Sequence, residues 1–81
     1  MIFNPVRGGG GKPAQKDVRV YSNSDVFSVA YMLEGTVNVI RLSTPRTIHA
    51  DAGSMLVILS DKGNSASNCK DLGQGIYQVN A

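Results

Sequence analysis

The chain has 81 residues, which is enough for one small domain. Its single cysteine, Cys69, excludes a disulfide within the chain, and its single histidine, His49, excludes a structural zinc site built from His and Cys. The formal net charge of +2 is too small to indicate a nucleic-acid partner.

A domain of this size buries only about 60% of the surface that its unfolded chain exposes. A lone core of that kind supplies only about 3–5 kcal/mol of net stability, so small domains usually need a further source of stability such as disulfides, a metal or oligomerisation. With no disulfide or zinc site, self-association is the remaining common solution. We therefore predict a homo-oligomer, with a compact monomer as the alternative.

No segment approaches the roughly 18 consecutive apolar residues of a membrane span, and the longest apolar run is residues 55–59. Residues 1–6 are too short for the apolar part of a signal peptide, and glycines follow at once. A lone cysteine is compatible with a reducing compartment. We expect a soluble cytoplasmic protein with no membrane partner.

The basic character of the chain lies near its N-terminus. Residues 1–20 carry four cations and one carboxylate, whereas residues 21–81 carry four cations and five carboxylates. We therefore divide the chain into a glycine-rich basic arm, residues 1–17, and a single β domain, residues 18–81.

The domain consists mainly of short runs of strand-forming residues between turn signals. We predict strands at residues 18–21, 37–42, 47–50, 55–59 and 76–79. Residues 55–59 are apolar throughout, which is typical of a central strand. Residues 60–67 are predicted to be an exposed polar loop.

Residues 24–34 fit two structures. As a strand, the segment places Phe27 and Val29 on a wholly apolar face that would point to the core. As a helix, it would begin after Ser24 as N-cap and end before Gly35. We favour the strand, because Glu34 and Gly35 then form a tight hairpin turn into the next strand. The prediction is a mostly β fold, a small antiparallel barrel or sandwich of five to six short strands.

The arm holds the segment with the most distinctive chemistry. Successive glycine amides can fold into a nest that holds phosphate oxygens, with flanking cations supplying charge. It is not a P-loop, because Pro13 stands where Ser or Thr is needed. The alternative interpretation is a flexible linker, which we favour. The candidate ligand-binding residues are Arg7, Gly8, Gly9, Gly10, Gly11 and Lys12, with Arg41 and Arg46 assisting.

Evidence for catalysis is weak. His49 and Asp51 would share a face of a strand, but a solvated histidine at a loop edge is the simpler interpretation. Cys69 beside Lys70 suggests a thiol of lowered pKa, yet a small buried core residue is favoured. We therefore predict a protein that is not an enzyme and has no cofactor or metal.

The opening residues 1–6, Met-Ile-Phe-Asn-Pro-Val, run directly into a glycine tract. This start resembles that of small uncharacterised bacteriophage-encoded β proteins, and residues 75–79 are similar in style. The resemblance implies a phage protein acting in the host cytoplasm or in the virion.

Two functions remain open on this basis. The first is a homo-oligomeric binding protein that sequesters a small anionic, nucleotide-like ligand or a host factor, as a counter-defence. The second is a structural protein of the phage particle, a cement or tail element, in which residues 1–6 act as an arm.

Overall fold

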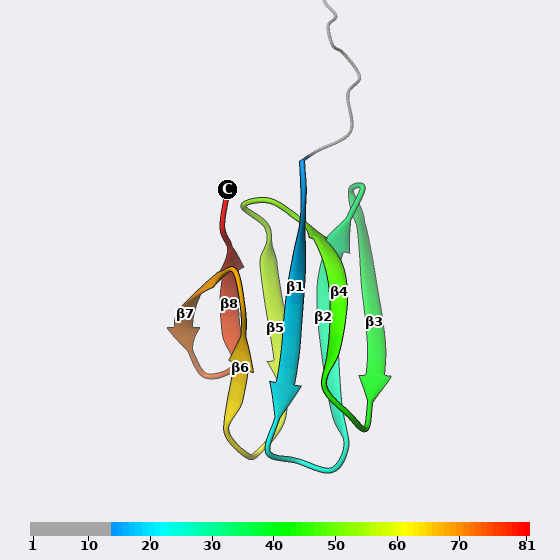
Figure 1. Cartoon of the computed structure of the whole chain (residues 1–81), viewed down its shortest axis with the longest axis vertical. Helices are drawn as coiled ribbons and strands as arrows, with labels where there is room; N and C mark the ends of the chain where they lie inside the picture. The colour runs from blue at the N-terminus through cyan, green and yellow to red at the C-terminus, as the bar shows by residue number, and fades with distance from the viewer. Residues whose placement is uncertain (1–13) are drawn as a thin grey trace, which may run out of the picture.

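The computed structural model describes residues 14–81, which form strands joined by turns and loops (Figure 1). Within these residues no helix is long and apolar enough to cross a membrane. In chain order the strands are β1 (Gln15–Ser22), β2 (Phe27–Leu33), β3 (Thr36–Leu42), β4 (Arg46–Asp51), β5 (Met55–Leu59), β6 (Asn64–Ala66), β7 (Cys69–Gly73) and β8 (Ile76–Val79).

The strands form two antiparallel sheets. One has three strands in the order β4-β1-β6, and the other has five in the order β3-β2-β5-β8-β7. Figure 1 shows β1, β4 and β6 lying in front of the larger sheet. The predicted mostly β fold is therefore confirmed, and the arrangement is that of a small sandwich.

The core lies between the two sheets because each strand sends alternate side chains toward the other sheet. On β1, Val18 and Val20 are fully buried, while Arg19 between them is exposed. The complete set of buried apolar side chains in residues 14–81 is Val18, Val20, Phe27, Val29, Leu42, Ile48, Ala50, Leu56, Ile58, Tyr77 and Val79.

Residues 27–33 are a strand, so the helical alternative for residues 24–34 is wrong. β2 is paired on both sides, with β3 and with β5, and these two ladders satisfy backbone groups that a helix would have satisfied internally. Phe27 and Val29 point into the core, as the strand interpretation predicted. The β2–β3 turn has positive φ at Glu34 (53°) and Gly35 (77°), which matches the tight hairpin turn expected there.

The structure has more strands than the five to six predicted. β1 begins at Gln15 rather than at residue 18, because its polar first residues pair with the end of β4. β6 lies within the predicted loop 60–67, and β7 was not predicted at all. Both are short and polar, so only their pairing with β1 and β8 reveals them.

The β7–β8 turn lies very close to β5, and this contact requires glycine at position 75. The N–H of Ile58 donates to the carbonyl of Gly75 at 2.7 Å. A Cβ at Gly75 would clash with the carbonyl oxygen of Ile58. Gly53 has nearly the same φ, 82° against 79°, but open space around the position of a Cβ.

We expect Gly75→Ala to lower the free energy of unfolding by about 1–3 kcal/mol more than Gly53→Ala. Both variants carry the cost of an alanine at positive φ, about 1–2 kcal/mol, so their difference isolates the close approach to Ile58. Urea unfolding of the two variants measures this difference. Equal destabilisation would show that the turn can move away from β5.

Candidate functional site

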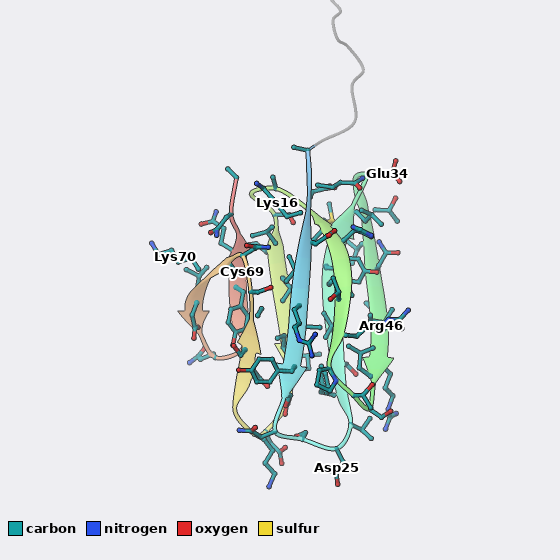
Figure 2. All side chains as sticks on the ribbon, viewed as in Figure 1. Lys16, Asp25, Glu34, Arg46, Cys69 and Lys70 are labelled. Carbon is teal, nitrogen blue, oxygen red and sulfur yellow. The ribbon has the colours of Figure 1, made fainter. Side chains whose placement is uncertain are left out.

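Of the predicted ligand-binding residues, the structure describes only Arg41 and Arg46. Arg7, Gly8–Gly11 and Lys12 lie outside the described residues. Arg41 is exposed on β3 of the five-stranded sheet. Arg46, labelled in Figure 2, is the exposed first residue of β4 in the other sheet. The two arginines therefore belong to different sheets.

A hollow of about 380 Å³ lies beside the β5–β6 loop and the β7–β8 turn. Its charged lining consists of Asp61, Asp71 and Lys62, with no arginine among the lining residues. Both carboxylates already accept hydrogen bonds, Asp61 from the Ser24 hydroxyl at 3.2 Å and Asp71 from the Gly73 N–H at 2.7 Å. An excess of carboxylates disfavours an anion, so this hollow does not suit the predicted nucleotide-like ligand.

His49 and Asp51 do not act together. The Nδ1 atom of His49 lies 2.7 Å from Oδ1 of Asp17, its cross-strand neighbour on β1. Both side chains are largely exposed, at 64% and 70%, so the pair contributes little to stability. Asp51 is 93% buried and its two carboxylate oxygens accept the backbone N–H groups of Glu34 and Gly35, at 2.9 and 3.2 Å.

Asp51 therefore fastens the β2–β3 turn of one sheet to the end of β4 in the other. Asp51→Asn would replace one acceptor oxygen by an NH₂ group facing an N–H donor. We expect a loss of about 1–3 kcal/mol in the free energy of unfolding. The matched control is Asp25→Asn, an exposed residue of the β1–β2 loop, which should change stability by less than about 0.5 kcal/mol. Equal effects would contradict the role of Asp51.

Cys69 is partly buried and packs against the core from β7, whereas a fully buried residue was predicted. Burial raises the pKa of its thiol, so the neighbouring Lys70 does not produce a reactive thiolate. Lys70 is exposed and extends away from the sheet (Figure 2).

We expect Cys69 to react with a disulfide reagent at pH 8 several times more slowly than free cysteine does. The rate should rise with pH, because the raised pKa keeps the thiol protonated until more alkaline conditions. Absorbance of the released thiolate follows the reaction, and the urea-unfolded protein serves as control. A folded-state rate equal to that of the unfolded protein would contradict this.

The most distinctive surface is the side of the five-stranded sheet that points away from the three-stranded sheet, here called the outer face. The large apolar side chains of β3 and β5 are exposed there: Val37 (65%), Val39 (67%), Met55 (45%) and Leu59 (59%). Their sequence neighbours Leu56 and Ile58 are buried in the core. The outer face thus remains uncovered by the other sheet.

The strand register arranges these residues in rows across the sheet. Directly paired residues of an antiparallel ladder lie on the same face. The middle row contains Val39, Ala30, Val57 and Ile76, and every member is apolar. In the neighbouring row Val37 pairs with Met32, and Met55 pairs with Gln78. The apolar residues therefore form a continuous patch rather than scattered side chains.

The outer face was not among the sites predicted from the sequence. The sequence feature that could have indicated this face is the run 55–59, in which all five residues are apolar. A strand of that composition has apolar side chains on both faces, and Val37 and Val39 provide the same signal on β3. Which of the two faces is covered depended on the position of β1, β4 and β6.

In residues 14–81 no group of three or more His, Cys, Asp or Glu side chains is placed to hold a metal ion. No protein-family model matches this chain, and neither the curated proteins nor the solved structures contain a significant match. The outer face of the five-stranded sheet is therefore the candidate site that the geometry favours.

Proposed function

We propose that this protein is a non-catalytic assembly protein, in which copies of the β-sandwich join through the outer face of the five-stranded sheet. The observation that carries the proposal is the continuous apolar patch that includes Val39 and Leu59, exposed by 67% and 59%. Monomeric proteins rarely expose contiguous apolar patches larger than a few hundred Å², and such patches commonly mark interaction sites.

The dimensions of the outer face suit a second copy of the chain. Strands about 4.8 Å apart that rise about 3.4 Å per residue give a surface roughly 20 Å on each side. Two such sheets can pack about 10 Å apart with interdigitating side chains, as sheets do inside proteins. This contact would supply the additional apolar burial that a small domain lacks.

The charges on the outer face permit this contact. Arg41 at one end of β3 and Lys70 on β7 flank the patch, and both lie on edge strands rather than in its centre. Long basic side chains at a rim keep their charge in water while their stems cover apolar surface. The middle row, which contains Val39, Ala30, Val57 and Ile76, therefore carries no charge.

Of the two roles that the phage resemblance implies, this proposal corresponds to the structural one, a cement or tail element. The ligand-binding role depends on residues 7–12, which the structure does not describe, and it remains a prediction from the sequence. Native mass spectrometry tests both roles, because it gives the number of copies in each assembly and a bound nucleotide would add to the mass.

Leu59→Lys places a charge within the exposed apolar patch and should lower the assembly affinity by at least tenfold. Sedimentation velocity over a concentration series measures the shift toward monomer. The matched control is Val26→Lys, a 46% exposed residue of the β1–β2 loop, which lies beside Asp25 at one end of the sandwich (Figure 2).

The control variant should assemble like the unmodified chain. A protein that stays monomeric up to millimolar concentration would overturn the proposal. So would a Leu59→Lys variant that assembles with unchanged affinity, because the contact would then lie elsewhere on the surface.

A further inference from the structure

Strand β3 is the edge of the five-stranded sheet, and its outer margin is unpaired in the described chain (Figure 1). The two-residue turn at Glu34 and Gly35 fixes which backbone groups point to β2. The pair Leu33 and Thr36 flanks the turn and exchanges hydrogen bonds, and the hydrogen-bonded pairs then recur at every second residue. The N–H and C=O groups of Val37, Val39 and Arg41 consequently point to the open margin.

The other three edge strands are protected against pairing with another strand. β6 has three residues, and short edge strands offer few backbone groups. β7 has a bulge between Asp71 and Gly73, which interrupts a regular ladder. β4 carries the exposed polar side chains Arg46 and His49 within six residues. A charged side chain such as that of Arg46 disfavours edge pairing.

β3 is longer than these strands, and its one charged residue, Arg41, lies near its end. It has seven residues in unbroken register with β2, and its sequence Thr-Val-Asn-Val-Ile-Arg-Leu contains no proline, glycine or lysine. Exposed, regular, apolar edge strands are sites at which chains join by strand pairing.

We propose that β3 pairs with β3 of a second copy of this chain, antiparallel about a two-fold axis at Val39, to form one continuous sheet across both copies. In this register Val39 faces Val39 of the second copy and Val37 faces its Arg41. All three outward-pointing residues then exchange their N–H and C=O groups with the partner strand. A register shifted by two residues in either direction would leave some of these groups unpaired.

The side chains on the outer face fit this register. The two valines at position 39 form a β-branched pair, which is favourable across strands. Val37 meets the aliphatic stem of Arg41, so no two like charges lie opposite each other on this face. The strand is therefore complementary to itself, which identifies a second copy as the occupant of the edge.

This contact is separate from packing across the outer face, and a dedicated measurement distinguishes the two. Hydrogen exchange followed by NMR resolves the individual amides of β3 at low and high protein concentration. The amides of Val37, Val39 and Arg41 should exchange rapidly in the dilute sample and gain at least tenfold protection in the concentrated one. Those of Asn38 and Ile40 should be protected in both, because they bond to β2.

Two variants complete the experiment. Val39→Pro removes an N–H that points to the open margin and no bond to β2, so it should abolish the protection gained at Val37 and Arg41. Leu59→Lys disturbs the outer face and should leave that gain in place. If Val39→Pro does not fold, the concentration dependence in the unmodified chain still decides.

One result would overturn edge pairing: rapid exchange at Val37, Val39 and Arg41 at every concentration, in a sample that sedimentation shows to be assembled. Assembly through the outer face would then still stand. Protection that rises equally at all β3 amides would also overturn it, since edge pairing protects alternate residues. Loss of protection in Leu59→Lys as well would assign the effect to the outer face.

Discussion

The alternation of side chains along a strand is the constraint on which the rest of this structure depends. Two layers of strands enclose one core, so each strand can bury only every second residue. Val18 and Val29 are fully buried between the sheets. The five-stranded sheet carries apolar residues in both alternating sets, and the three-stranded sheet covers only one of them. The exposed valines of β3 follow directly from this arrangement.

Polar side chains near the strand ends hold the two sheets together. At one end Asp51 of β4 accepts hydrogen bonds from the β2–β3 turn. At the other end the hydroxyl groups of Ser22 and Ser24 lie 2.8 and 2.7 Å from that of Ser60, which links the β1–β2 loop to the segment after β5. Asp51, which the sequence offered as a possible partner of His49, therefore serves the fold.

The two proposed contacts have a joint consequence for the shape of an assembly. Each is isologous, because the same surface of both copies takes part. Edge pairing extends the sheet sideways, whereas packing across the outer face stacks one sheet on another. A protomer with two different two-fold contacts can build an open array rather than a closed dimer. Such an array matches the role of a structural element better than that of a carrier of small ligands.

The sequence by itself determined the β class, the buried side of residues 27 and 29, the hairpin turn at Glu34 and Gly35, and the bounds of β5 and β8. These features depend on local alternation and turn chemistry, which neighbouring residues encode. Only the tertiary structure decided that β6 and β7 are strands, that Asp51 bonds to a turn 16 and 17 residues earlier in the chain, and which apolar face stays uncovered. Each of these depends on contacts between segments far apart in the chain, and the local sequence pattern does not indicate which segments pair.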